Sequence, residues 1–233
     1  MDDFSGKLMV ELREVFAGES RQMALFVVTL EEYPCINFDI EYTYTYVAGR
    51  RMIHFDGIGL SEACLTAFGP ARAFIGLGEM QEGSHDVHIE INRETIITSF
   101  DVTEDILKLS VLGGYSPFLD FYEKEMHRLS ADHVWGYVHS KMPGTETDYA
   151  DFFARLWQVQ AEEEVLPPGN YGFFRIGEGY FVLFDHTNHY MPENPFVIKF
   201  DGDFQVLEQI ALEFSDQYMV SLYSGRGDVF FNQ

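Results

Sequence analysis

The first half of the chain alternates hydrophobic and polar residues with a period of two, which is typical of half-buried β-strands. Residues 38–46 show this most clearly, because Phe38 and Ile40 fall on one face while Asp39 and Glu41 fall on the other. Similar alternation, or a continuous apolar run, predicts further strands at residues 24–30, 87–91 and 107–111. Turn residues separate these stretches and no helical pattern intervenes. Residues 8 to 112 are therefore predicted to form an antiparallel β-sandwich.

The pattern changes at Gly113-Gly114, after which apolar residues recur at helical spacing. Three helices are predicted, one capped by Ser116 and extending to Leu129, one capped by Asp148 and one capped near Asp203. Strands are predicted between them, at residues 133–139, 171–176, 180–184, 196–200 and 218–223. The chain thus divides into a β-sandwich domain at residues 1–113 and an α+β domain at residues 114–233. The short Gly-Gly junction predicts that the two domains pack together.

Composition and charge restrict the class of partner. The 233 residues are 46% hydrophobic and 16% aromatic, so the chain can build folded cores. A net charge of −23 repels phosphates and anionic head groups, which argues against nucleic acid as a partner. No run of 18 apolar residues occurs, so no transmembrane span is expected. The start of the sequence lacks a signal-peptide pattern, which fits either a cytoplasmic protein or one whose signal Met1 replaces.

The chain has two cysteines, Cys35 and Cys64, and both lie in the strand-rich part. A disulfide between them would close a loop of about 30 residues and stabilise the fold by roughly 3.6 kcal/mol in the chain-entropy model. Such a bond favours an oxidising compartment. The competing interpretation is a pair of buried thiols in a cytoplasmic protein.

Part of this region resembles a known class of module. Pro34-Cys35 leads into a strand, residues 64–71 read Cys-Leu-Thr-Ala-Phe-Gly-Pro-Ala, and strands follow at 73–77 and 83–91. Over residues 30 to 112 this resembles the Ig-like modules of exported bacterial surface proteins and lipoproteins. The resemblance implies an exported, non-catalytic sandwich in the periplasm or at the cell surface, with a lipid anchor if the native amino terminus is longer. The chain departs from the Ig pattern because no Trp lies between its cysteines.

His133, Trp135, Tyr137 and His139 form the most suggestive group of side chains. On a strand all four point to one face, because successive residues alternate between faces. Flat aromatic and imidazole rings in a row can stack on a sugar or another ligand. The competing interpretation is that the row packs under the first predicted helix as part of the core.

A second group, Asp185, His186 and His189, follows a predicted strand and offers oxygen and nitrogen ligands to a divalent cation such as zinc. A polar turn is the competing interpretation. The acidic run at residues 162–164 lies near the predicted carboxyl end of the second helix, where negative charge opposes the helix dipole. It indicates either a nearby cation or basic partner, or a solvated face.

Together these features predict a non-catalytic exported or cell-surface protein that binds a carbohydrate, peptide or protein ligand. The alternative is a metal-assisted hydrolase with its site in the carboxyl-terminal domain. That alternative requires Asp185, His186 or His189 to meet another such group, for example His133 or His139, in one cleft. A cytoplasmic acidic protein that acts only through its interactions is a third interpretation.

We predict that Cys35 and Cys64 are disulfide-bonded. Unfolded, unreduced protein should then show no titratable thiol, and the double variant Cys35→Ala, Cys64→Ala should be less stable by about 3.6 kcal/mol. Thiol titration with and without a reductant measures the first effect, and urea unfolding measures the second. Two free thiols before reduction would contradict the prediction.

Overall fold

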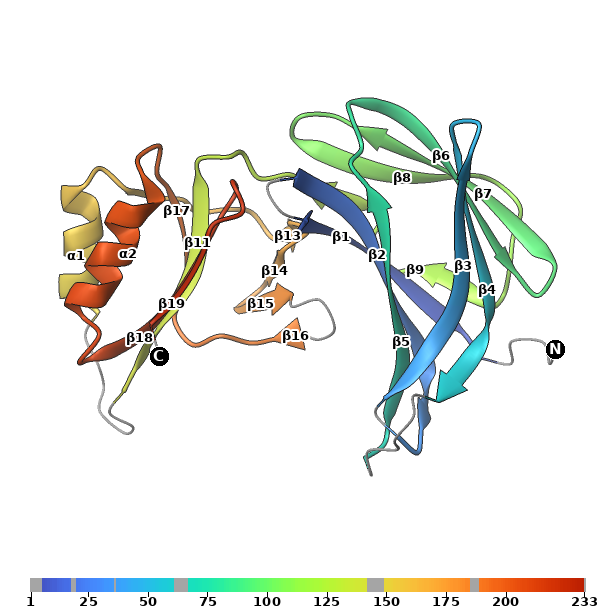
Figure 1. Cartoon of the computed structure of the whole chain (residues 1–233), viewed down its shortest axis with the longest axis horizontal. Coiled ribbons are helices and arrows are strands. Elements are labelled where there is room, and N and C mark those ends of the chain that lie inside the picture. The colour runs from blue at the N-terminus through green and yellow to red at the C-terminus, as the bar shows by residue number, and fades with distance from the viewer. Residues whose placement is uncertain are drawn as a thin grey trace.

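The computed structural model describes residues 6–17, 20–35, 37–60, 67–141, 149–184 and 189–232. Strands dominate these residues, and they contain two short helices. The strands form three sheets of ten, five and four strands. In Figure 1 the ten-stranded sheet lies at one end of the molecule, the five-stranded sheet at the other, and the four-stranded sheet between them. The prediction of a β-rich fold is confirmed.

The ten-stranded sheet contains the whole amino-terminal part of the chain. Its order is β10-β8-β7-β6-β4-β3-β5-β2-β1-β9. The strands are β1 (Leu8–Ala17), β2 (Ser20–Tyr33), β3 (Phe38–Val47), β4 (Arg50–Leu60), β5 (Gly69–Gly78), β6 (Gly83–Ile91), β7 (Glu94–Val102), β8 (Ile106–Gly113), β9 (Leu119–Phe121) and β10 (Glu125–His127). The alternation predicted at residues 38–46, 87–91 and 107–111 therefore gives β3, β6 and β8.

The ten-stranded sheet curls until one short segment joins both of its edges. β9 pairs in parallel with β1, and β10 pairs antiparallel with β8. Between these strands, the Tyr122 amide donates to the Val10 carbonyl (2.9 Å), and the Leu109 amide donates to the Lys124 carbonyl (2.7 Å). Inward-facing residues from all round the curl, including Leu8, Ile53 and Phe100, form one buried core. Residues 119–127 thus pair with the outer sides of both β1 and β8, and one core serves the strands of the curl.

Three predictions for this region are affected: the first helix, the boundary at Gly113-Gly114 and the Ig-like sandwich. The helix predicted from Ser116 to Leu129 is wrong, because this stretch contains β9 and β10 and no helix. The curled sheet therefore extends past Gly113-Gly114, the predicted boundary, to His127. An Ig-like sandwich is not confirmed, because all the amino-terminal strands belong to a single hydrogen-bonded sheet, whereas a sandwich has two. The division of the chain into two domains stays a prediction.

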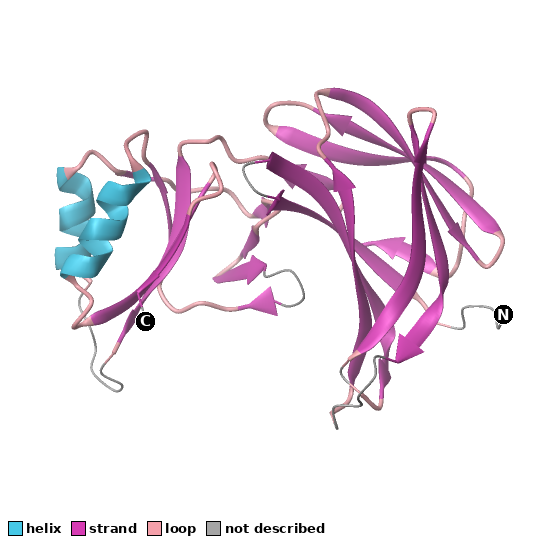
Figure 2. Ribbon diagram, in the orientation of Figure 1, coloured by secondary structure: helices cyan, strands magenta, loops and turns pink. Residues whose placement is uncertain are grey.

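The five-stranded sheet has the order β12-β17-β11-β18-β19 and is covered on one face by the helices (Figures 1 and 2). Its strands are β11 (His133–Ser140), β12 (Glu162–Glu163), β17 (Pro195–Lys199), β18 (Tyr218–Ser224) and β19 (Val229–Asn232), and the helices are α1 (Ala150–Gln158) and α2 (Phe204–Glu213).

The last two predicted helices are confirmed as α1 and α2. Asp203 caps α2 as predicted, since its carboxylate accepts from the Gln205 amide. Tyr149 occupies the cap position of α1, and the predicted cap Asp148 lies outside the described residues. Neither helix is long and apolar enough to cross a membrane.

The four-stranded sheet, with the order β13-β14-β15-β16, docks on β1. Its strands are β13 (Gly169–Asn170), β14 (Phe174–Gly177), β15 (Tyr180–Phe184) and β16 (His189–Tyr190). The Asn170 amide group donates to the Leu12 carbonyl (2.9 Å), and the Glu14 amide donates to the Gly172 carbonyl (3.1 Å). These bonds tie the carboxyl-terminal part of the chain to the curled sheet.

Cys35 is buried and takes part in a disulfide. Cys64 lies outside the described residues, so the pairing of Cys35 with Cys64 stays a prediction.

We expect Gly172→Ala to destabilise the docking of the four-stranded sheet. Gly172 has φ +77°, and a Cβ added there would lie 3.0 Å from both the Glu14 nitrogen and the Met126 sulfur. Gly179 is a matched control, because it has φ +76° and open space around its Cβ position. Both alanine variants carry the same backbone strain, so Gly172→Ala should cost about 1–3 kcal/mol more in urea unfolding, through overpacking. Equal losses would show that the approach of Gly172 to β1 is not tight.

Candidate functional site

A cleft of about 510 Å³ lies where the three sheets meet. Strands β1 and β5 line one side, β15 and Phe173, just before β14, line another, and β11, β18 and β19 close it. Seven of its fifteen lining residues are aromatic: Phe16, Phe74, Trp135, Phe173, Phe184, Tyr223 and Phe231. We call this cavity the aromatic cleft. Concave sites with mostly apolar walls and a few polar groups are the usual form of ligand sites.

Trp135 forms the floor of the aromatic cleft. It is only 2% exposed and stacks on Phe173, with ring centroids 4.9 Å apart, and on Tyr223, at 6.2 Å. Phe173 stacks in turn on Phe16 of β1 at 5.1 Å. These rings come from two sheets and from the segment between β13 and β14, so the shape of the cleft depends on how these parts dock.

Buried charges lie beside the cleft on the outer face of β1. Glu11 accepts from the guanidinium groups of Arg13 (2.9 Å) and Arg175. The Arg13 guanidinium lies 4.0 Å from the ring centroid of Phe26 and 4.2 Å from that of Phe184. These arginines therefore have both a carboxylate partner and an aromatic ring, as buried charges require.

A second ion-pair cluster is centred on Glu14, which also lines the cleft. Its carboxylate accepts from Arg21 and, at 3.1 Å, from Arg128. Burial lowers the pKa of Arg21, and its contact with Glu14 opposes that shift. The charges of Arg13 and Glu14 are therefore balanced by ion pairs within the protein. The rest of the cleft wall, which a ligand would contact, is mainly apolar.

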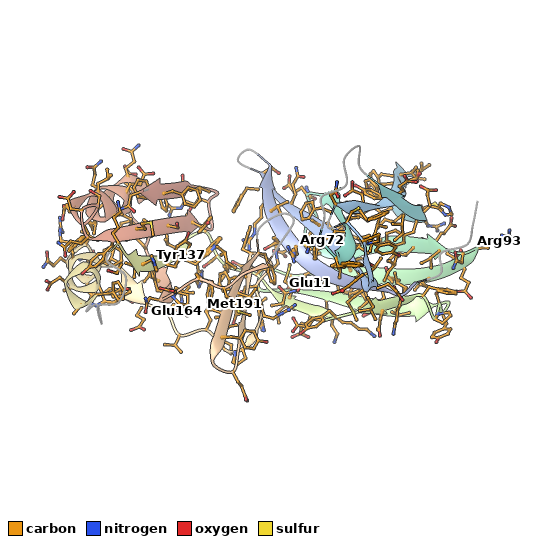
Figure 3. The ribbon with its side chains drawn as sticks, turned by 90° about the horizontal axis from the view of Figure 1, so that it is seen from below. Glu11, Arg72, Arg93, Tyr137, Glu164 and Met191 are labelled. Carbon is orange, nitrogen blue, oxygen red and sulfur yellow. The ribbon has the colours of Figure 1, made fainter. Side chains whose placement is uncertain are left out.

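A second cavity of about 510 Å³ lies further along the same sheet face. It is lined by Tyr137, His139, Met191, Glu193, Met219, Ser221, Phe231 and Asn232, and we call it the methionine pocket. His139 contacts Glu193 through Nδ1 at 2.6 Å. Figure 3 labels Tyr137 and Met191 in the carboxyl-terminal part of the molecule. Phe231 lines both cavities, so the two are adjacent.

The structure brings three members of the predicted row to these cavities. All four residues lie on β11, where Val134 and Val138 face the helices and Trp135 faces the opposite side. Trp135 lines the aromatic cleft, and Tyr137 and His139 line the methionine pocket. The face that packs under the helices is therefore not the face of the row.

His133 lines neither cavity. It is buried, and its Nδ1 lies 2.7 Å from the Ser130 hydroxyl. Burial lowers the pKa of His133 below its usual value, while nearby Asp132 opposes the shift. Its contact with Ser130 holds the turn that precedes β11, and its predicted part in ligand binding stays a prediction.

The predicted metal ligands fall largely outside the described residues. Asp185 and His186 are not described, and for His189 only its place in β16 is given. Among the residues that are described, no group of three or more His, Cys, Asp or Glu is placed to hold a metal ion. The convergence that a metal-assisted hydrolase requires thus stays a prediction.

Sequence reasoning missed most of the cleft. Tyr223 and Phe231 reach it because β18 pairs with both β11 and β19. The alternation in residues 218–223 predicts a strand, but the sequence of this segment does not show which strands pair with it. Arg13 and Phe184 reach the cleft only through the docking of β15 near β1.

Comparison with known proteins does not assign the chain to a family. No protein-family model matches the chain, and neither a curated protein nor a solved structure matches it.

We expect His133 to make the fold less stable in mild acid. The unfolded chain binds a proton on this histidine below pH about 6.5, whereas the folded chain, with the lower pKa, does so only at lower pH. Stability should therefore fall as the pH drops from about 7.5 to 5. Urea unfolding of the wild type and of His133→Asn across this range measures the effect. The variant should lose less stability than the wild type, and parallel curves would contradict the assignment.

Proposed function

We propose that this protein is a non-catalytic binding protein that takes an extended, apolar stretch of a peptide or protein ligand. The observation that carries the proposal is the aromatic cleft, which lies directly beside β19, the edge strand of its sheet in the described part of the chain. Of the predicted ligand classes, carbohydrate, peptide and protein, a peptide segment fits this arrangement best.

The edge strand supplies the first argument. β19 is the last strand of its sheet among the described residues. The Ser224 amide donates to the Asp228 carbonyl (3.0 Å), so in the alternating antiparallel ladder the backbone groups of Val229 and Phe231 point away from β18. An extended peptide can add a strand to such an edge through main-chain hydrogen bonds.

The side chains next to this edge supply the second argument. Val229 is 51% exposed and Phe231 is 52% exposed, and both line the aromatic cleft. A peptide paired with β19 would place every second side chain over this apolar surface. A sugar would bring many hydroxyl groups to a cleft with mainly aromatic walls, where Glu14 already accepts from Arg21 and Arg128, and unmatched hydroxyl groups are costly to bury.

Charge and compartment complete the proposal. The net charge of −23 favours a ligand with basic residues beside its apolar ones. The disulfide of Cys35 supports a location outside the cytoplasm, in the periplasm or at the cell surface. The resemblance of residues 30–112 to Ig-like modules of exported proteins enters the proposal only through the exported, non-catalytic character that it implies.

The proposal is tested with a short peptide that alternates lysine with valine or phenylalanine, alongside an array of oligosaccharides. We expect the peptide to bind and Phe231→Ser to weaken binding by about tenfold or more, because the variant removes apolar contact area worth at least about 1.4 kcal/mol. Calorimetry measures the affinity. Phe68→Ser is the matched control, since Phe68 is 74% exposed and does not line the cleft.

The edge-pairing geometry has its own test. Val229→Pro removes an outward N–H and should abolish peptide binding, while Val229→Thr keeps the N–H and the shape and should retain most of it. Phe231-dependent binding of a sugar, with no binding of any peptide, would overturn the peptide proposal in favour of a carbohydrate ligand.

A further inference from the structure

A third cavity, of about 480 Å³, lies at the other edge of the five-stranded sheet. It is bounded by α1, by β17 and the segment after β12, and by β14 and β15. Trp157 is its most accessible ring, at 39% exposed. We call this cavity the Trp157 pocket. It shares no lining residue with the aromatic cleft or the methionine pocket, so it is a separate site.

The pocket exists because β12 is too short to cover β17. β12 pairs only with Ile198 and Lys199, and the Glu164 amide then donates to the Val197 carbonyl (3.0 Å). Beyond that bond, Pro195 and Phe196 have no strand beside them on this side among the described residues. The space that a longer strand would fill is left between α1 and β15.

Aromatic rings form the walls of the pocket. Phe153 and Trp157 lie one helical turn apart on α1 and stack with ring centroids 5.9 Å apart. Phe153 meets Phe196 of β17 edge to face at 5.4 Å. Phe181 of β15 lines the pocket too, and its position is fixed by stacking on Phe174 at 4.7 Å.

The charged residues that line the pocket are both acidic. They are Glu163 and Glu164, from the acidic run at residues 162–164. Glu164, labelled in Figure 3, forms an ion pair with Lys199 at 3.2 Å, whereas Glu163 is exposed. The sequence had placed this run at the end of a helix, but α1 ends at Gln158 and the run occupies β12 and the residue after it. The pocket therefore combines aromatic walls with a net negative rim.

The rings of the pocket differ from those of the aromatic cleft in one respect. In the cleft, Arg13 lies over Phe184, and Arg21 lies over Phe173 at 5.3 Å. Among the described residues, no arginine or lysine lies over Phe153, Trp157, Phe181 or Phe196. The ring faces that are not used in packing against other rings, above all at the exposed Trp157, are thus not covered by a cation of the protein.

We propose that the Trp157 pocket binds a small organic cation with a quaternary ammonium group. Such a cation is attracted by ring faces and by carboxylates together, and its methyl groups suit apolar walls. A bare metal ion would have to lose its water for two carboxylates of which one already has a lysine partner. The charge of −23 adds a field that concentrates cations near the surface. This proposal is independent of the peptide ligand proposed for the aromatic cleft.

Choline and its neutral carbon isostere, 3,3-dimethylbutan-1-ol, separate a cation site from an apolar pocket. The two probes have nearly the same shape, so only the charge differs. Trp157 and Trp135 are the two tryptophans of the chain, so the variant Trp135→Phe leaves Trp157 as the sole fluorescent reporter. We expect saturable quenching by choline, in this variant and in the wild type, with an affinity about tenfold or more above that of the alcohol. Equal affinity for both probes, or no saturable change with choline, would overturn the proposal.

Substitutions then locate the site. Glu163→Gln should weaken choline binding several-fold, whereas Glu178→Gln, which removes the same charge from an exposed turn outside the pocket, should not. Trp157→Leu keeps an apolar side chain but removes the ring face, and should weaken binding by about tenfold or more, as measured by saturation-transfer NMR on the choline methyl signal. Equal losses in Glu163→Gln and Glu178→Gln would show that the overall charge, and not this pocket, attracts the cation.

The source of the quaternary ammonium group is distinguished by a vesicle experiment. Flotation with phosphatidylcholine vesicles, with and without free choline as competitor, tests whether the group can be a lipid head group. Flotation that choline abolishes supports the pocket with a lipid source, and choline binding without flotation supports a free solute. Flotation that choline and Trp157→Leu leave unchanged, together with no choline binding, would overturn the proposal.

Discussion

The buried ion pairs on β1 are the constraint on which the arrangement of the three sheets depends. Glu11 and Arg13 lie on the outer face of β1, and the four-stranded sheet covers them. Charges removed from water need partners, and losing one partner of a buried pair costs about 3–5 kcal/mol. Arg175 of β14 gives Glu11 its second partner. Docking of the four-stranded sheet therefore covers the Glu11–Arg13 pair and gives Glu11 its second guanidinium partner in the same step, and it fixes where the aromatic cleft opens.

Aromatic rings and charged side chains are combined differently in the aromatic cleft and in the Trp157 pocket. At the sheet junction the protein's own arginines lie over the phenylalanine rings, so ring–cation attraction contributes to the fold. The Trp157 pocket has aromatic rings and acidic residues, and in our proposal the ligand supplies the cation. The first arrangement supports an apolar ligand and the second a cationic one. The contrast arises because β1 and β2 supply arginines at the cleft, whereas β12 and the residue after it supply glutamates at the pocket.

Local pattern predicted the elements better than their arrangement. The alternation at residues 38–46 and the cap at Asp203 depend on neighbouring residues, and both gave the expected element. The helix predicted from Ser116 failed because β9 and β10 are three residues each, too short for alternation to show. Their strand character comes from pairing with β1 and β8, which are remote in sequence.

The candidate site shows the same limit. The row on β11 was visible because its four members alternate along one strand. The residues that face it come from distant elements, for example Phe16 from β1 and Phe231 from β19. The parallel pairing of β4 with β6, which continues the curled sheet where a sandwich would divide, likewise has no signature in either strand. Register between remote strands is set by the collective packing of the core and not by any one segment.

The joining of both sheet edges by residues 119–127 has a consequence for how the chain folds. Leu8 pairs with Leu119, so just over half of the chain must be present before the first strand acquires its second neighbour. Closing so long a loop has a large entropic cost, and topologies dominated by such contacts fold slowly. Until residues 119–127 arrive, β1 and β8 are open edges on which another chain can pair. A nascent chain therefore keeps open sheet edges, and with them a route to aggregation, until this nine-residue segment has been made and has paired.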